Sequence, residues 1–311
     1  MNLIDEIKQL KKEKKALILA HNYELGEVQD IADFVGDSLA LARYARAAQE
    51  KILVMAGVYF MAETASILSP DKKVLIPDTN AGCSLADSIN VEQLRAWKKG
   101  HPNAVVVSYV NTSAAVKAES DYCCTSSNAV SVVESIPREQ EILFLPDMFL
   151  GSHVKRMTQR DNIHIWMGEC HVHAAIHPEV MAEELARHPK AELLVHPECG
   201  CTTKALTYPQ ETTHILSTDG MLKWAKESPK ETFIVATEVG LLHRRRQENP
   251  RKNFIAASNE AVCPFMKMIT LANIRDALYY EQHVVKVPDE MAQKAYLPIE
   301  RMVQISSHTP A

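Results

Sequence analysis

The sequence predicts an α/β protein in which three repeated three-layer α-β-α sandwich domains surround a pseudo-threefold axis. Three observations indicate this fold. Short apolar runs alternate with segments of helical spacing, the same landmarks recur about every 90 residues, and one cysteine recurs at the same place in each repeat. Strands that alternate with helices form parallel sheets covered by helices on both faces. We therefore expect one such sheet in each repeat.

Each repeat contains three apolar runs whose length and β-branched residues are typical of buried parallel strands. The first runs lie at 16–20, 105–110 and 192–195, the second begin at 52, 142 and 233, and the third lie at 73–77, 163–167 and 253–258. Cys123 and Cys124 lie in a further predicted strand and are expected in the core. These runs predict the strands of three sheets.

Helical spacing is clearest between the first and second runs. Residues 28–49 carry an apolar stripe that includes Ile31, Phe34 and Leu39, which predicts one helix. Residues 168–188 are also predicted to be helical, which would direct His171 and His173 to different sides. We therefore expect these two histidines in a second shell or at the surface.

The seams between the repeats also correspond, since His-Pro pairs stand at 101–102 and 188–189. The predicted units are a first repeat with an N-terminal helix at 1–102, a second at 103–189, a third at 190–283, and a C-terminal extension on the outer surface at 284–311. The third repeat is slightly longer, which predicts an insertion near 199–204. Cys199 and Cys201 are interpreted as incidental thiols of that insertion.

Composition excludes several classes of protein. The 311 residues are 46% hydrophobic and carry a formal charge of −5 without a basic block, which argues against a nucleic-acid partner. The apolar runs are shorter than the roughly 18 residues of a membrane span, and the N-terminal stretch has no secretory core. We therefore expect a cytoplasmic protein whose seven cysteines are thiols or metal ligands.

Polar residues follow the first strand of each repeat, and a small hydroxyl-bearing cluster stands where a later loop enters a helix. Ligands of open parallel sheets bind beyond the carboxyl ends of the strands, and helix N-termini attract anions. Three such ends facing one axis predict one central pocket that holds the active site. The predicted substrate-binding residues are His21, Ser38, Tyr109, Asn111, Ser126, His196, Glu198 and Thr218.

The recurring cysteines are Cys83, Cys170 and Cys263, spaced 87 and 93 residues apart. Three equivalent thiols around an axis predict one shared metal site. They favour a [4Fe-4S] cluster, in which one of four irons would lack a protein ligand. Zinc remains the alternative, because His171 and His173 adjoin Cys170.

Several motifs together resemble the quinolinate synthase family, which makes the pyridine ring in de novo NAD biosynthesis. The resemblance runs from about residue 16 to residue 280, and its motifs are HNYELGEVQDIADFVGDSL, AGVYFMAETA, VSYVNTSAAVKA, CTSSNA, GECHVH, HPEC and NEAVCPFMKMITLANI. It implies a transferase that condenses iminoaspartate with dihydroxyacetone phosphate to quinolinate, phosphate and water. It further implies one [4Fe-4S] cluster on Cys83, Cys170 and Cys263, and a functional link to an L-aspartate oxidase or dehydrogenase.

The predicted catalytic residues are Tyr23 and Glu198 as acid or base, with His21 and His196 adding charge or hydrogen bonds. The open iron would act as a Lewis acid on the hydroxyl that leaves as water. Two other functions stay open from the residues alone. They are an iron-sulfur hydro-lyase acting on a hydroxy acid and a non-enzymatic metal sensor. The hydroxyl side chains also stay open to interpretation as simple helix caps.

Overall fold

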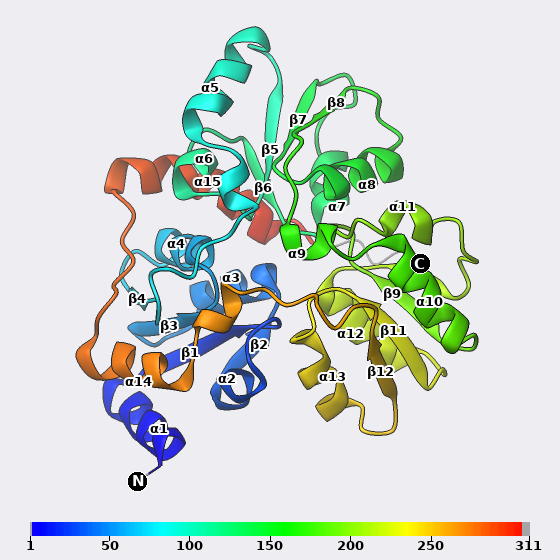
Figure 1. The fold of residues 1–311 in the computed structure, drawn as a ribbon. Helices are drawn as coiled ribbons and strands as arrows, with labels where there is room; N and C mark the ends of the chain where they lie inside the picture. The colour runs from blue at the N-terminus through cyan, green and yellow to red at the C-terminus, as the bar shows by residue number, and fades with distance from the viewer. Residues whose placement is uncertain (1, 307–311) are drawn as a thin grey trace.

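The computed structural model describes residues 2–306. Residue 1 and residues 307–311, which are the outer ends of the predicted first unit and of the C-terminal extension, lie outside the described residues. Figure 1 shows three α/β lobes arranged around a common centre, and each lobe contains one four-stranded parallel sheet. The predicted fold class is confirmed. No helix of the described part of the chain is long and apolar enough to cross a membrane.

The first sheet has the strand order β2-β1-β3-β4. Its strands are β1 (Ala16–His21), β2 (Phe34–Gly36), β3 (Ile52–Ala56) and β4 (Lys73–Leu75). The helices of this lobe are α1 (Leu3–Lys14), α2 (Gly26–Ile31), α3 (Ser38–Ala47) and α4 (Tyr59–Leu68). Asn2 and Asp37 begin α1 and α3, because their side chains accept hydrogen bonds from backbone N–H groups of the first turn.

The second sheet repeats this order as β6-β5-β7-β8. Its strands are β5 (Val105–Tyr109), β6 (Tyr122–Cys124), β7 (Ile142–Leu145) and β8 (Ile163–Ile165). Its helices are α6 (Ala114–Lys117), α7 (Ala129–Glu134) and α8 (Met148–Thr158). Cys123 and Cys124 are fully buried in β6, so the prediction that they belong to a strand and to the core is confirmed.

The third sheet has the corresponding order β10-β9-β11-β12. Its strands are β9 (Glu192–Val195), β10 (Thr213–Ile215), β11 (Thr232–Ala236) and β12 (Asn253–Ala256). Its helices are α11 (Thr202–Ala205), α12 (Thr218–Glu227) and α13 (Leu241–Glu248). The predicted insertion near 199–204 coincides with α11 and the turn before it.

The segment after each cysteine crosses to the next lobe, and we call these three segments the crossing segments. They contain η1 (Ala86–Ser88) with α5 (Val91–Gly100), α9 (His171–Ala174) with α10 (Pro178–Arg187), and η2 (Met266–Met268) with α14 (Leu271–Tyr280). Leu94 of α5 packs with Val106 of the second sheet, and Met181 of α10 packs with Leu193 of the third. The helix α14 returns to α1 and β3 of the first lobe, so the crossings close a ring.

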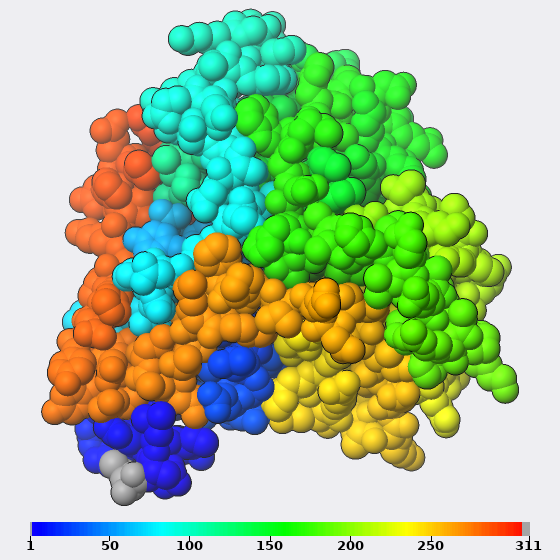
Figure 2. Space-filling model, viewed as in Figure 1, coloured from blue at the N-terminus to red at the C-terminus, as the bar shows by residue number. Residues whose placement is uncertain are grey.

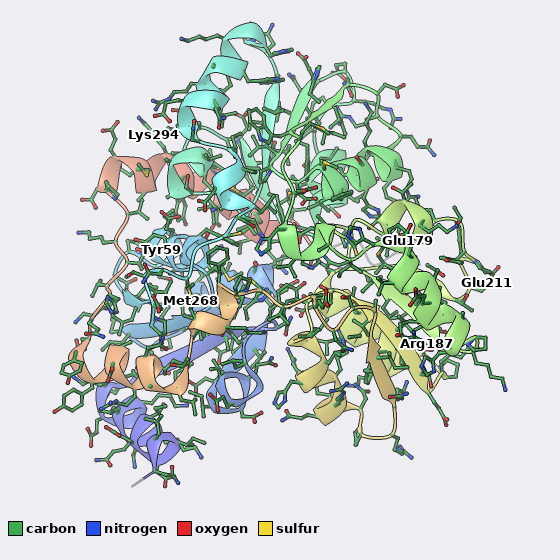
Figure 3. All side chains as sticks on the ribbon, viewed as in Figure 1. Tyr59, Glu179, Arg187, Glu211, Met268 and Lys294 are labelled. Carbon is green, nitrogen blue, oxygen red and sulfur yellow. The ribbon has the colours of Figure 1, made fainter. Side chains whose placement is uncertain are left out.

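The last helix, α15 (Asp289–Gln304), packs against α3 and α4 of the first lobe and α6 and β6 of the second. Ile299 and Met302 on its inner face have no exposed surface. Figure 3 shows Lys294 of this helix, and Glu179 and Arg187 of α10, at the outer surface. The helix therefore joins two lobes, while the predicted boundaries of all four units remain predictions.

Two predicted helices are interrupted. The single helix predicted at 28–49 is wrong, because β2 separates α2 from α3. Phe34 pairs with Leu19 in the sheet, and Asp33 accepts the backbone N–H of Ile18. The helix predicted at 168–188 divides into α9 and α10 at Pro178, which has no N–H to donate to the preceding turn.

Candidate active site

All residues that the sequence assigned to the site line one cavity at the centre of the ring. Each lobe contributes the ends of its first two sheet strands, the entry to a helix, and the cysteine after its last strand. The space-filling view in Figure 2 shows the three lobes meeting over this centre, where cyan, green and orange segments lie against one another. The geometry therefore brings the predicted set together, while the role of each residue remains a prediction.

The three cysteines occupy turns with the same hydrogen bonds. The N–H groups of Asp87, Ala174 and Lys267, each four residues after a cysteine, donate to the carbonyl oxygen of that cysteine at 2.8–3.2 Å. The carbonyl oxygen two residues before each cysteine accepts a hydrogen bond from a backbone N–H group. That N–H group belongs to the segment just after β3, β7 or β11, a central strand of its sheet. These pairs are Tyr59 with Ala81, Met148 with Gly168, and Val239 with Ala261. The repeat seen in the sequence is thus a repeat of backbone geometry.

Each cysteine sulfur also faces two backbone N–H groups, from the residues two and three positions further along. These donors are Leu85 and Ala86 for Cys83, Val172 and His173 for Cys170, and Phe265 and Met266 for Cys263. Hydrogen bonds to sulfur stabilise the thiolate form and are a regular feature around metal-bound thiolates.

Burial nevertheless raises the pKa of Cys83 to about 12 and also raises the pKa of Cys170 and Cys263 above the ordinary value. The thiol of Cys83 lies close enough to both other cysteines for their charges to interact. Three half-buried thiols whose pKa values are raised in this way cannot all ionise unless a cation replaces their protons. The donor set therefore fits a metal centre held by three soft thiolates.

A chain of polar contacts connects the first and third lobes next to Cys170. The hydroxyl of Tyr23 lies 2.6 Å from Thr237 Oγ1 and 3.3 Å from His173 Nε2. The other ring nitrogen of His173 lies 3.3 Å from the sulfur of Cys170. Burial raises the pKa of Tyr23 above its ordinary value and lowers that of His173 to about 3. Both side chains are therefore neutral near pH 7.

Glu198 lies among imidazoles and is itself buried. Its Oε2 atom is 3.2 Å from His173 Nδ1 and 3.6 Å from His196 Nδ1. Burial raises the pKa of Glu198 to about 7, although a hydrogen bond from Tyr109 favours the charged form. A carboxyl group with this pKa can accept or release a proton near neutrality. Glu198 thus has the environment expected of an acid or base.

The two predicted histidines do not carry charge in this cavity. Burial, together with the nearby charge of Lys267, lowers the pKa of His21 to about 3. Burial likewise lowers the pKa of His196, whose Nε2 atom lies 3.2 Å from the Ser126 hydroxyl. They can therefore act as neutral hydrogen-bonding groups, which is one of the two roles predicted for them, and that role remains a prediction.

The hydroxyl residues stand at helix entries. Ser38 is the first residue of α3 and Thr218 the first of α12, whereas the helix caps are Asp37 and Ser217. Ser126 lies in the turn before α7. Since Ser38 and Thr218 are not the caps of their helices, their hydroxyl groups remain available to the cavity that they line.

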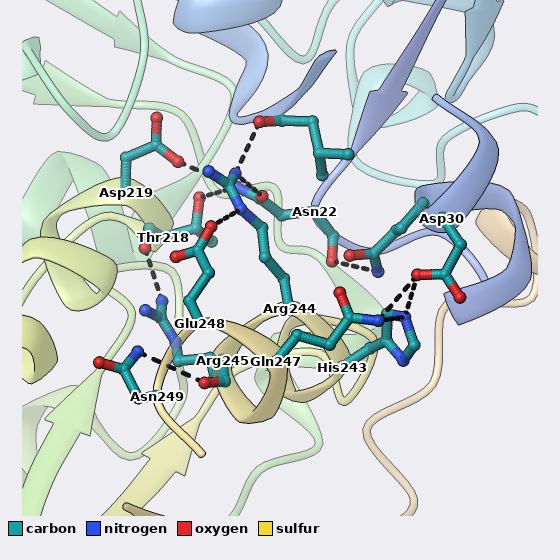
Figure 4. A network of polar contacts seen from close by, with 12 residues as sticks. Asn22, Asp30, Thr218, Asp219, His243, Arg244, Arg245, Gln247, Glu248 and Asn249 are labelled. Carbon is teal, nitrogen blue, oxygen red and sulfur yellow. Dashed lines mark hydrogen bonds and ion pairs between the residues drawn. The ribbon is translucent and has the colours of Figure 1, made fainter. Parts of the chain in front are cut away.

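Thr218 is held by a polar network between the first and third lobes (Figure 4). Asn22 Nδ2 donates to Thr218 Oγ1 at 3.2 Å and to Asp219 Oδ1 at 3.0 Å. Arg244 donates to Asn22 Oδ1 at 3.2 Å, and the buried Arg245 donates to the Thr218 carbonyl at 2.7 Å. This wall of the cavity is therefore fixed by both lobes.

The structure adds residues that the sequence analysis missed. His173 is buried, and its ring lies with Cys170 and Glu198 within 4.8 Å, a group that can hold a metal ion. His171 also lines the cavity, but it is exposed and contacts Ser84. The signal for His173 was its spacing of three residues from Cys170, which places both side chains on one side of a helical turn.

Glu238 and Lys267 form a second missed pair. Lys267 Nζ lies 2.8 Å from Glu238 Oε1 and also donates to the Tyr23 carbonyl. Glu238 lines the cavity and accepts the backbone N–H of Cys263 at 3.1 Å. The pair therefore connects a cysteine turn to the segment that carries Tyr23. No spacing rule in the sequence pointed to it.

Cys199 and Cys201 are buried and do not line the cavity. Their sulfur atoms are 2.8 Å apart, and both thiols pack in the apolar core of the third lobe. They belong to the turn between Glu198 and α11. Their interpretation as incidental thiols of an insertion is not tested by this packing.

Comparisons with known proteins identify the family. The family model described as "Quinolinate synthetase A protein" matches residues 5–304. The quinolinate synthase of Mycobacterium sp. (strain KMS) is 55% identical over 306 residues, which cover 96% of this chain and 91% of that protein. The quinolinate synthase of Mycobacterium tuberculosis is 54% identical over 96% of this chain and 88% of that protein. The resemblance of the motifs is confirmed, and the chain belongs to the quinolinate synthetase A family.

Proposed function

We propose that this chain is a transferase that condenses iminoaspartate with dihydroxyacetone phosphate to quinolinate, with loss of phosphate and water, in de novo NAD biosynthesis. The observation that carries the proposal is the single central cavity, which all the predicted site residues line. Family membership favours this reaction over the hydro-lyase and the metal sensor that the residues alone left open.

The family implies an iron-sulfur cluster. We infer that the cluster is of the [4Fe-4S] type and is held by Cys83, Cys170 and Cys263, because three equivalent sulfurs share one cavity. When bound, such a cluster would offer an iron without a protein ligand as a Lewis acid for a hydroxyl or carboxylate group. Zinc is the less favoured metal, since the repeat supplies three equivalent ligands rather than four.

Substrate anions would be held without cationic side chains, because neither lysine nor arginine is among the described residues that line the cavity. Ser38, Ser126 and Thr218 supply hydroxyl donors. The N-termini of α3 and α12 add the positive ends of helix dipoles. These groups suit the phosphate and carboxylates of the two substrates, and Asn111 and Tyr109 add an amide and a phenol.

The proton transfers of ring closure need an acid and a base. Glu198 is the residue with a pKa near neutrality, and its buried Oε1 atom has no hydrogen-bond partner among the described residues. We assign it to proton transfer at the substrate. Tyr23 is the second candidate, held by Thr237 and His173, while His21 and His196 would orient polar groups of the substrate.

The cellular part of the proposal follows from the substrates. Iminoaspartate is unstable, so an L-aspartate oxidase or dehydrogenase would have to supply it close by. We keep the cytoplasm as the proposed location, because seven free thiols suit a reducing compartment.

The test is an anaerobic assay of the cluster-loaded protein with freshly generated iminoaspartate and dihydroxyacetone phosphate. We expect quinolinate and inorganic phosphate in equal amounts, and neither product when dihydroxyacetone phosphate is omitted. Protein that contains its cluster but forms no quinolinate would contradict the proposal. Dehydration of a hydroxy acid by the same preparation would then favour the hydro-lyase.

A further inference from the structure

A second group of metal-ligating side chains lies in the second lobe, away from the cavity. His101 Nδ1 is 2.8 Å from Glu141 Oε1, and His164 Nε2 is 2.6 Å from the same oxygen. One possible ligand atom from each residue falls within 4.8 Å of the others. None of the three residues lines the central cavity. Two imidazoles and a carboxylate thus converge at a place that the proposed reaction does not use.

We propose that His101, Glu141 and His164 form a binding site for a divalent transition metal, with zinc as the best fit. Both imidazole nitrogens point at one carboxylate oxygen, so a single ion could be reached by all three groups. Zinc binds nitrogen and oxygen ligands at about 2.0–2.2 Å, and two histidines with one glutamate are a known zinc ligand set. Small outward shifts from the present contacts would make room for the ion.

The ring of His101 is already held in place. It stacks on the indole of Trp97 with a centroid distance of 4.0 Å and an interplanar angle of 5°, and Trp97 also meets His164 edge-on at 5.7 Å. The Glu141 backbone is fixed as well, because its carbonyl accepts the N–H of Val105 at 2.8 Å. Preorganised ligands reduce the ordering cost of metal binding.

The site is open to solvent on one side. The side chains of His101, Glu141 and His164 retain 32%, 36% and 47% of their exposure. Water would therefore complete the coordination shell. His101 and Glu141 precede β5 and β7, whereas the cavity lies at the carboxyl ends of these strands. A metal here would connect the end of α5 to β8 and would not touch the substrates.

The chain offers a matched control. His188 ends α10 as His101 ends α5, with φ and ψ of −129° and 64° against −136° and 63°. Its nearest carboxylate, Glu184, lies 3.9 Å away, and His188 belongs to no group of three possible ligands among the described residues. His188→Ala therefore removes an equivalent histidine without removing the proposed site.

The experiment uses cluster-loaded protein, so that the cluster cysteines are not free to bind zinc. Native protein, His101→Ala, His164→Ala and His188→Ala are dialysed anaerobically against buffered zinc, and zinc and iron are measured in each. We expect one zinc per chain in the native protein and in His188→Ala. The other two variants should bind zinc at least about tenfold more weakly at unchanged iron content.

Tryptophan fluorescence gives a second readout. Nickel in place of zinc should quench emission in the native protein, and the quenching should be lost in His164→Ala, which keeps Trp97. Quinolinate formation should be unchanged in both histidine variants. Equal zinc binding by native protein and His101→Ala, or no zinc binding by native protein, would overturn the inference.

Discussion

Glu198 is the residue whose environment is most unusual for its chemistry. It is a buried carboxyl group whose contacts are two neutral imidazoles and a phenol, and no lysine or arginine among the described residues pairs with it. Burial without a cationic partner is the condition that raises a carboxyl pKa, here to about 7. The same condition makes the group useful for moving protons at neutral pH.

The change Glu198→Gln keeps the shape of the side chain and removes its proton transfer. We expect kcat for quinolinate formation to fall by about 10²–10⁴-fold. If Glu198 acts as a base, the native rate should rise as pH increases through about 7, where the carboxylate form becomes dominant. The variant should lack this rise. Unchanged kcat with the same pH profile would contradict the role, and iron content serves as the control for cluster loading.

The sequence predicts the site residues that lie in the repeat or in the family motifs. It does not predict residues that reach the site only through contacts formed in the folded chain. For His173 the sequence left two places open, behind the metal ligands or at the surface, and the structure buries it beside Cys170 and Glu198. Lys267 and Glu238 lie 29 residues apart in sequence, and only the fold brings them to 2.8 Å. Such a pair cannot be read from periodicity, because the positions equivalent to Lys267 in the other repeats hold Asp87 and Ala174.

The crossing segments are the elements that make one site out of three lobes. Each begins with a cysteine turn of the same hydrogen bonds and ends in a helix that covers the next sheet. The cysteine is therefore anchored on both sides by different lobes. This arrangement explains why three thiols so far apart in sequence can face one cavity.

The helix α15 should contribute to stability by joining the first two lobes. Ile299→Ala removes a side chain with no exposed surface and should lower the free energy of unfolding by about 2–5 kcal/mol. Leu297→Ala in the same helix is the control, since Leu297 is 52% exposed and should cost about 0.5 kcal/mol or less. Denaturant unfolding measures both. Equal effects of the two changes would contradict a contribution of the buried face of α15 to stability.

Strands could be predicted where an apolar run was long and had clear ends, as in the runs that form the first and second predicted strands of each repeat. The stretch 28–49 was misread because Phe34 and Val35 fit a helical stripe as well as a short strand. The pairing of Phe34 with Leu19 makes residues 34–36 a strand, and Asp37 caps the helix that follows. The pairing with Leu19 is a tertiary contact that local spacing does not contain.

The whole molecule is a ring of three similar lobes closed by α14 and α15. Its central cavity receives one cysteine, one hydroxyl-bearing helix entry and one set of polar strand ends from each lobe. The sequence predicted this plan because every landmark recurs in the same order. It could not predict how α15 crosses between two lobes, since that segment has no counterpart in the repeats.

The measurement that tests this account most directly is cluster content together with quinolinate formation in single cysteine variants prepared anaerobically. Native protein and Cys124→Ala, whose cysteine is buried outside the cavity, should contain about four irons per chain and form quinolinate. Cys83→Ala, Cys170→Ala and Cys263→Ala should each lose both. A variant of any of these three that keeps the full cluster and the native rate would contradict a cluster shared by the three lobes.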